Sequence, residues 1–155
     1  MPCGKLIILE LEGELFFGVA PELDAVLAGL TARAREGART IVLRLKRTRN
    51  PDMVCMEKLQ HFLEDMQKLG VLVLLCGVRE DFALALDRLG FHDWLPGERI
   101  FLEDAPGNNG DGPMISSTLR AVKRAYELLG EDLCATCPRK HEMEQERQRG
   151  WYYMI

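Results

Sequence analysis

One stretch of the chain, residues 39–69, constrains the fold more than any other. Its first part, residues 41–45, is a short apolar run rich in β-branched residues, typical of a strand covered on both faces. Asn50, Pro51 and Asp52 then supply a helix N-cap, a proline for the first helical position and an anion for the positive first turn. A helical periodicity follows, carried by Met53, Met56, Leu59, Phe62, Leu63, Met66 and Leu69. We therefore expect a buried strand, a short basic loop and a long amphipathic helix.

The remaining segments alternate between strand and helix patterns. Strands are expected over residues 6–11, 15–19, 41–45, 71–76 and 100–102, and the first two lie close enough to form a hairpin. Helices are expected over residues 21–36, 51–69, 80–89 and 115–129. The inward face of the first helix includes Val26, and that of the last includes Leu119 and Tyr126. This order predicts an α/β fold: a mixed, mostly parallel sheet of about four to five strands with about four helices and right-handed crossovers.

Composition narrows the class of protein. A chain of 155 residues, 47% hydrophobic and 28% charged, is ordinary for a globular protein with one hydrophobic core. The net charge of −4 argues against nucleic acid as a partner. No apolar run reaches the length that a transmembrane segment needs, and no signal-peptide pattern opens the chain. The odd number of cysteines, 5, fits a reducing compartment, so we expect a cytoplasmic protein.

The two ends of the chain differ in composition. We expect one domain over residues 1–130, in which turn-forming residues at 104–113 mark a long loop. A C-terminal extension is expected over residues 131–155, and its end, residues 151–155, is unusually aromatic. The extension is therefore predicted to be a Cys-containing and aromatic tail appended to the domain.

The tail contains a possible metal site. Cys134, Cys137 and His141 have ligand types and spacings that match half of a zinc site. Structural zinc takes four ligands, and Cys3 is a candidate for the fourth if the two termini meet. The alternative is that the tail binds no metal, because a single Cys-x-x-Cys motif is a weak signal, and no other cofactor is expected.

An interaction site is expected where the strand at 41–45 joins the helix at 51–69, outside the carboxyl end of a central strand. Lys46, Arg47 and Arg49 precede a helix N-terminus, where free N–H groups already favour anions. A phosphate, a nucleotide or an acidic protein partner fits this loop. The alternative is a solvated loop whose charges keep the protein in solution.

The junction itself supplies further candidate docking residues. Asn50 and Asp52 stand at the helix start, and Asp52 is either a recognition carboxylate or only a stabiliser of the helix, worth about 0.3–1 kcal/mol. Val54, Cys55 and Lys58 lie off the apolar stripe, so two apolar residues are expected near the surface. Either they contact a partner or a neighbouring loop covers them.

Four segments carry a resemblance to a known family: LEGELFFG at 11–18, IVLRL at 41–45, GVLVLLCGV at 70–78 and LDRLGF at 86–91. Their order and spacing resemble the STAS domain, the family of sulfate-transporter cytoplasmic domains and bacterial anti-sigma-factor antagonists. The combination is most similar to the domain that ends SulP-type anion transporters. The resemblance covers about the first four-fifths of the chain and implies an α/β fold with a regulatory or docking role.

The resemblance also implies that a phosphorylation switch is missing. The family motif at the start of the long helix is an Asp, a small residue, a Ser or Thr, and often a Gly, and the hydroxyl is phosphorylated in antagonists. Here Asp52 matches, whereas Val54 occupies the hydroxyl position and Cys55 the glycine position. Valine has no oxygen to phosphorylate, so no phosphoacceptor is expected, and the nearby hydroxyl of Thr48 lies before the motif.

The hypothesis drawn from these features is a non-enzymatic regulatory or protein-interaction domain of, or associated with, a SulP-like sulfate or anion transporter. Its partner would be a protein or the transporter's membrane domain, which would place it at the membrane. The alternatives are a free-standing signalling protein like the anti-sigma-factor antagonists and a small module that senses an anion or nucleotide. An enzyme is not expected, because His61 and His92 each stand alone without an identifiable nucleophile or acid.

Overall fold

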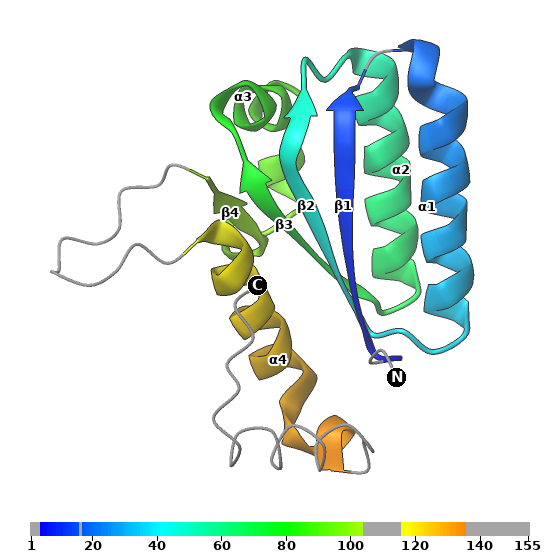
Figure 1. Cartoon of the computed structure of the whole chain (residues 1–155), viewed down its shortest axis with the longest axis vertical. Helices are drawn as coiled ribbons and strands as arrows, with labels where there is room; N and C mark the ends of the chain where they lie inside the picture. Colours follow the sequence, from blue (N-terminus) through cyan, green and yellow to red (C-terminus); the bar gives the residue numbers. More distant parts are fainter. Residues whose placement is uncertain (1–3, 16, 104–115, 136–155) are drawn as a thin grey trace, which may run out of the picture.

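The computed structural model describes residues 4–15, 17–103 and 116–135 (Figure 1). Its strands are β1 (Leu6–Glu14), β2 (Thr40–Arg49), β3 (Leu72–Val78) and β4 (Ile100–Leu102). Its α-helices are α1 (Ala20–Arg35), α2 (Met53–Lys68), α3 (Glu80–Arg88) and α4 (Ser117–Ala135). Short 3-10 helices are η1 (Phe17–Val19), η2 (Phe91–Asp93) and η3 (Gly97–Arg99).

The described strands form one parallel sheet in the order β1-β2-β3-β4. A helix lies between each pair of consecutive strands, as parallel pairing requires, and the predicted α/β fold is confirmed. The predicted hairpin is wrong. Residues that were expected to form its turn continue β1, because Glu12 and Glu14 pair with Arg47 and Arg49 of β2.

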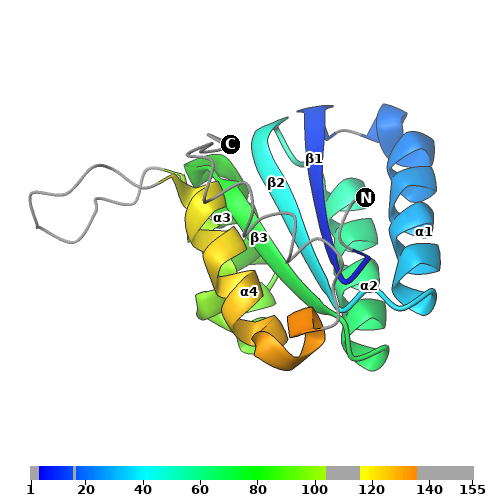
Figure 2. The ribbon, with the colours of Figure 1, turned by 60° about the horizontal axis from the view of Figure 1, so that its bottom comes forward.

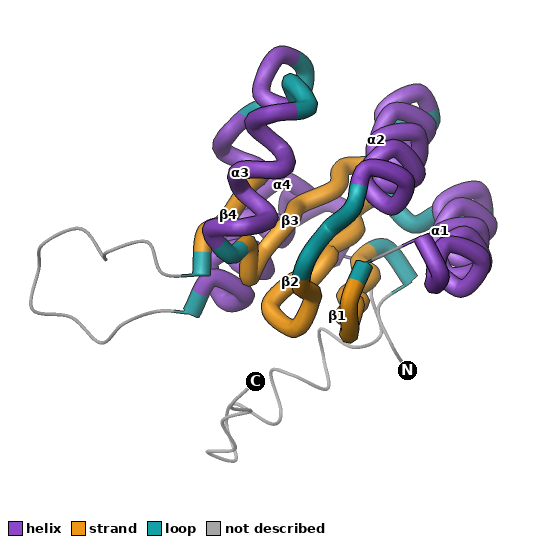
Figure 3. The backbone as a smooth tube through the Cα atoms, turned by 90° about the horizontal axis from the view of Figure 1, so that it is seen from above, coloured by secondary structure: helices purple, strands orange, loops and turns teal. Residues whose placement is uncertain are grey.

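Helices cover both faces of the sheet (Figures 2 and 3). Helices α1, α2 and α3 pack on one face, over a core that includes Ile41, Leu43 and Leu45 of β2. Helix α4 packs on the other face against Val42 of β2 and Leu74 of β3, since side chains alternate along a strand. The segment at 41–45, predicted to be a strand covered on both faces, is therefore covered on both sides, and so is β3.

In two helices, some of the residues that the periodicity places inward are exposed, although others on the same predicted faces are buried. In α4, Leu119 and Tyr126, which the periodicity places inward, are 42% and 46% exposed, and Val26 of α1 is exposed as well. The buried residues of α4 are mostly small or polar: Ser117, Thr118, Ala121, Val122, Ala125 and Leu129. Hydroxyl groups that bond to the strands, and alanines that permit close approach, set the orientation of this helix in place of its larger apolar residues.

No helix in the described part of the chain is both long and apolar enough to span a lipid bilayer. The predicted division between a domain at 1–130 and an extension at 131–155 stays a prediction. Helix α4 runs across that boundary, and Gly130 interrupts it with a non-helical backbone (φ 72°, ψ 165°). The predicted loop at 104–113 and the aromatic end at 151–155 lie outside the described residues.

Candidate partner-docking site

The start of α2 carries most of the predicted site residues. Asp52 is the N-cap: its Oδ1 accepts a hydrogen bond from the backbone N–H of Cys55 at 2.9 Å, and the helix begins at Met53. The prediction that Asn50 caps the helix, with Pro51 as its first residue, is therefore wrong by two positions. Asn50 instead has a left-handed backbone (φ 48°), which asparagine tolerates better than most residues, and it turns the chain out of β2.

Hydrogen bonds to the backbone hold this junction in place. The N–H of Asp52 donates to the carbonyl of Leu15 at 2.8 Å, and the N–H of Leu15 donates to the carbonyl of Arg49 at 3.0 Å. From the other side, Asp81 of α3 accepts from the N–H of Asn50 at 3.4 Å. Contacts within the chain thus fix the start of α2 before any partner binds.

Two apolar side chains are exposed in the first turn of α2. Met53 is 57% exposed and Val54 43% exposed, whereas Cys55 and Met56 are buried. Successive helical residues point about 100° apart, so the first two face outward and the next two face the core. The surface position predicted for Val54 agrees with this, but the inward position predicted for Met53 and the docking role predicted for Cys55 do not.

We define the α2-start surface as Asp52, Met53, Val54, Glu57 and Lys58. Helix α1 borders it, because Lys58 Nζ donates to Asp24 Oδ2 at 2.6 Å. Cys55 lies beneath it, where burial and then the nearby carboxylate of Asp52 raise the pKa of the thiol. The thiol is therefore a small apolar core group and not a nucleophile at neutral pH.

The basic segment before the junction was predicted to be a loop. It is instead the end of a strand. Lys46, Arg47 and Arg49 belong to β2, and the register sets Arg47 opposite Glu12 and Arg49 opposite Glu14. Arg47 Nη1 donates to Glu12 Oε1 at 2.6 Å, and this hydrogen bond raises the pKa of Arg47. Arg47 is thus paired with a carboxylate of β1 and Lys46 with Glu103, whereas Arg49 only lies opposite Glu14 in the strand register.

The hydroxyl group of Thr48 also lies within β2. It is buried, and its Oγ1 donates to the carbonyl of Leu45 at 2.5 Å. This hydroxyl is therefore enclosed within the fold and bonded to the backbone of its own strand.

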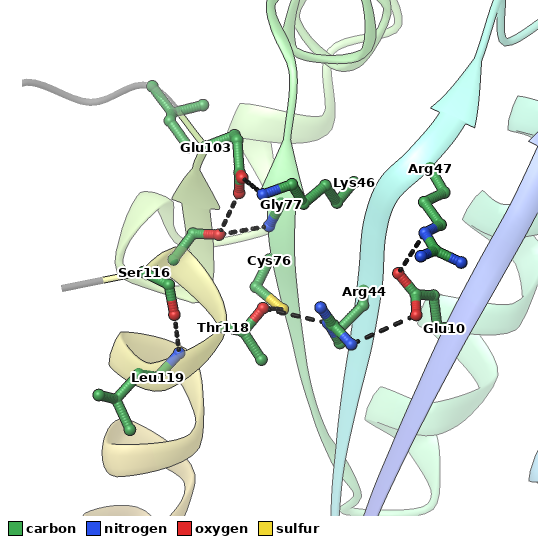
Figure 4. Close-up of polar contacts among 12 residues, drawn as sticks. Glu10, Arg44, Lys46, Arg47, Cys76, Gly77, Glu103, Ser116, Thr118 and Leu119 are labelled. Carbon is green, nitrogen blue, oxygen red and sulfur yellow. Dashed lines mark hydrogen bonds and ion pairs between the residues drawn. The ribbon is translucent and has the colours of Figure 1, made fainter. Parts of the chain in front are cut away.

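A polar cluster that no sequence pattern predicted lies where α4 begins (Figure 4). Arg44 of β2 donates from Nη1 to Glu10 at 3.3 Å and from Nε to Thr118 Oγ1 at 3.1 Å. The thiol of Cys76 lies 3.8 Å from the same hydroxyl. Because Glu10, Arg44 and Cys76 are neighbours across three strands, this row joins α4 to the sheet.

Ser117 forms the second half of this α4-start cluster. Its Oγ accepts from the N–H of Gly77 at 3.0 Å and donates to Glu103 at 2.7 Å, and Glu103 also pairs with Lys46. Burial alone would raise the pKa of Glu103, but hydrogen bonds from Lys46 and Ser117 outweigh it and lower that pKa. At Gly77 (φ 66°) a Cβ would come 2.7 Å from the backbone nitrogen of Lys46, so the position requires glycine.

The sequence does contain a signal for part of this cluster. Glu10 interrupts the apolar run at 6–11, and Arg44 interrupts the run at 41–45. Opposite charges inside two apolar strands indicate a cross-strand pair when the strands are neighbours. The hairpin prediction concealed this signal, because it paired residues 6–11 with 15–19.

The predicted zinc ligands are only partly covered by the structure. Cys134 lies in the last turn of α4, whereas Cys3, Cys137 and His141 lie outside the described residues. Within the described segments, no group of three His, Cys, Asp or Glu side chains is placed to hold a metal ion. Zinc binding by the tail stays a prediction.

Comparison with known families shows that the model of the STAS domain matches residues 4–104. All four segments that carry the predicted resemblance fall inside this range, as do the four strands and the α2-start surface. No sequence among the curated proteins matches the chain significantly.

Several solved structures resemble the chain. A sulfate transporter family protein from Wolinella succinogenes is 36% identical with a TM-score of 0.54, covering 64% of this chain and 77% of that one. The SulP transporter STAS domain from Vibrio cholerae is 20% identical with a TM-score of 0.57, covering 83% and 88%. The unphosphorylated anti-sigma factor antagonist SpoIIAA is 15% identical with a TM-score of 0.50, covering 61% and 80%. At their lower identities, the last two show a shared fold.

Proposed function

The chain belongs to the STAS-domain family, and on this premise we propose that it is a non-enzymatic docking domain whose α2-start surface contacts a protein partner. STAS domains are in general non-catalytic domains that regulate or bind other proteins or transporters. The proposed partner is the membrane domain of a SulP-like sulfate or anion transporter, met at the cytoplasmic side of the membrane. The 36% identity with a sulfate transporter family protein supports this choice.

The observation that carries the proposal is the exposure of Met53 and Val54 on a helix start that is already fixed by Leu15 and Asp81. Burying the exposed parts of these two side chains would contribute on the order of 1–3 kcal/mol to binding. Because the surface needs no rearrangement, little of that free energy is lost to ordering the site.

We further propose that no phosphate switch controls this contact. Val54 offers no hydroxyl at the family's phosphorylation position, and the hydroxyl of Thr48 is buried in β2. The contact is then constitutive, and its strength is set by the side chains present.

Photo-crosslinking tests the docking role. Benzoylphenylalanine replaces Val54 in one variant and Leu128, an exposed residue of α4, in a matched control. The variant at position 54 should give an adduct that contains a peptide of a SulP-type membrane domain, and the control should not. The same adduct from both positions, or none from position 54, would contradict the proposal.

The alternative is a free-standing signalling protein, which the fold shared with SpoIIAA supports. Incubation with an anti-sigma kinase-type protein and intact-mass measurement separate the two functions. The proposal expects no added phosphate, while phosphorylation within residues 48–58 would favour the alternative. Calorimetric titration with sulfate and nucleotides should give no heat of binding, because Lys46 and Arg47 already pair with Glu103 and Glu12, and Arg49 lies opposite Glu14.

A further inference from the structure

Charges around the α2-start surface specify the chemistry of its partner. Resting on the docking role proposed above, we propose that this surface binds a protein segment in which Lys or Arg side chains surround an apolar residue. The sequence predicted the reverse, an acidic partner or an anion at a basic loop.

The first argument is the balance of charge at the junction. Five carboxylates from four elements lie on or beside the surface: Glu14, Asp24, Asp52, Glu57 and Asp81. They outnumber the neighbouring cations Arg49, Lys58 and Arg79, the last of which is the N-cap of α3, so the local net charge is negative.

One of these cations already pairs with a carboxylate of this chain, and a second lies opposite one in the sheet. Lys58 is bonded to Asp24 at 2.6 Å, and the strand register sets Arg49 opposite Glu14. An acidic ligand would have to compete with Asp24 for Lys58, whereas Glu57 and Asp81 are exposed carboxylates that a basic side chain can reach.

The helix N-terminus does not restore an anion site. Free N–H groups at the start of a helix attract anions, but here the carboxylate of Asp52 already accepts from the N–H of Cys55. The chain thus fills this position itself. The same carboxylates would repel an anionic membrane surface, so a protein segment fits better than lipid.

The apolar part of the surface sets the second requirement. Met53 and Val54 are exposed side by side at its centre, with Asp52 before them and Glu57 one turn later. A partner residue that covers them should be apolar, and its charged neighbours then meet the carboxylates. Charge complementarity of this kind speeds association and selects the partner.

Two designed helical peptides of equal length and identical leucine positions test the inference, one with lysine and one with glutamate at the remaining positions. Each is titrated into the isotopically labelled full chain and followed by NMR. The lysine peptide should shift the amide signals of residues 52–58 and 81 and bind about tenfold more tightly than the glutamate peptide. Raising the ionic strength from about 0.05 to 0.5 M should weaken its binding.

A charge variant and a matched control locate the effect. Glu57→Lys with Asp81→Asn should weaken binding of the lysine peptide by about tenfold. Asp65→Lys with Asp87→Asn makes the same change of charge on the same two helices, beyond their first turns, and should leave binding unchanged. Circular dichroism and urea unfolding check that both variants fold, and Glu57→Lys alone serves if the double variant does not.

Several outcomes would overturn the inference. These are equal or tighter binding of the glutamate peptide, shifts that spare residues 52–58, equal weakening by both charge variants, and binding to phosphatidylserine vesicles as tight as to the lysine peptide. If crosslinking at position 54 succeeds while the lysine peptide fails, the docking role stands and the basic partner is refuted. If the lysine peptide binds as expected while crosslinking fails, the proposed transporter partner is refuted and the surface chemistry stands.

Discussion

Helices α2 and α4 both begin at the edge of the sheet where the strands end, on opposite faces, and their first turns are built in contrasting ways (Figure 1). The first turn of α2 is capped by Asp52 and held by backbone hydrogen bonds through Leu15, which leaves Met53 and Val54 exposed. The first turn of α4 buries the hydroxyls of Ser117 and Thr118 against β2, β3 and Glu103.

This difference indicates which helix start is available to a partner. At α2, backbone hydrogen bonds fix the start of the helix, so the exposed side chains of the first turn can contact another molecule. At α4 the side chains themselves hold the helix, so few of them remain. Substitutions at the α4 start should therefore change stability, and substitutions at the α2-start surface should mainly change binding.

The largest effect is expected at Gly77, beneath the α4 start. Gly77→Ala combines a left-handed alanine with a Cβ 2.7 Å from the backbone of Lys46, and it should lower the free energy of unfolding by about 2–5 kcal/mol. Urea unfolding measures this loss. Gly70→Ala is the control: it has a similar φ of 69° but open space around it, so only about 1–2 kcal/mol should be lost. Equal losses would contradict the requirement for close packing at Gly77.

The next effect concerns the hydroxyl of Ser117. Ser117→Ala leaves the buried N–H of Gly77 without its partner and should cost about 1–3 kcal/mol in urea unfolding. Ser116→Ala removes only an exposed cap of the same helix, whose Oγ accepts from the N–H of Leu119 at 3.2 Å, and should cost about 1 kcal/mol. A larger loss from Ser116→Ala would place the anchor of α4 in its cap and weaken the contrast with α2.

A smaller effect is expected from the cap of α2. Asp52→Ala should lower the free energy of unfolding by about 1 kcal/mol, because the N–H of Cys55 loses its acceptor. Asp52→Asn keeps an oxygen at the cap and should stay close to the wild type. If thermal and urea unfolding give the same loss for both variants, the charge of Asp52 matters more than its hydrogen bond.

The smallest effect is a dependence on pH at the α4 start. The folded-state pKa of Glu103 is lowered, so its ionised form contributes stability that is present above the ordinary value of 4.5 and is lost as the pH falls through the folded-state value. The free energy of unfolding, measured in urea, should therefore fall more steeply for the wild type than for Glu103→Gln as the pH drops below about 4.5. Parallel curves would show that Lys46 and Ser117 do not hold this carboxylate in its ionised form.

The sequence alone determined the features that depend on neighbouring residues. Apolar runs at 41–45 and 71–76 predicted the central strands, and the periodicity from Met56 to Met66 predicted the buried face of α2. The surface position of Val54 followed from the same periodicity. The sequence correctly predicted that a helix starts near Pro51. Its N-cap is Asp52 and not Asn50, because several residues around Pro51 can serve as the starting point.

Only the tertiary structure decided which strands are neighbours, and the chemistry of both helix starts followed from that choice. Arg47 contacts Glu12 across 35 positions of sequence, and Arg44 contacts Thr118 across 74. No local pattern could therefore reveal that carboxylates of the same chain pair with the basic segment, or that hydroxyl groups hold α4 on the sheet. Periodicity tells which side of an element is apolar. It does not tell which element will cover that side or which charges will meet there, because those depend on how distant segments pack.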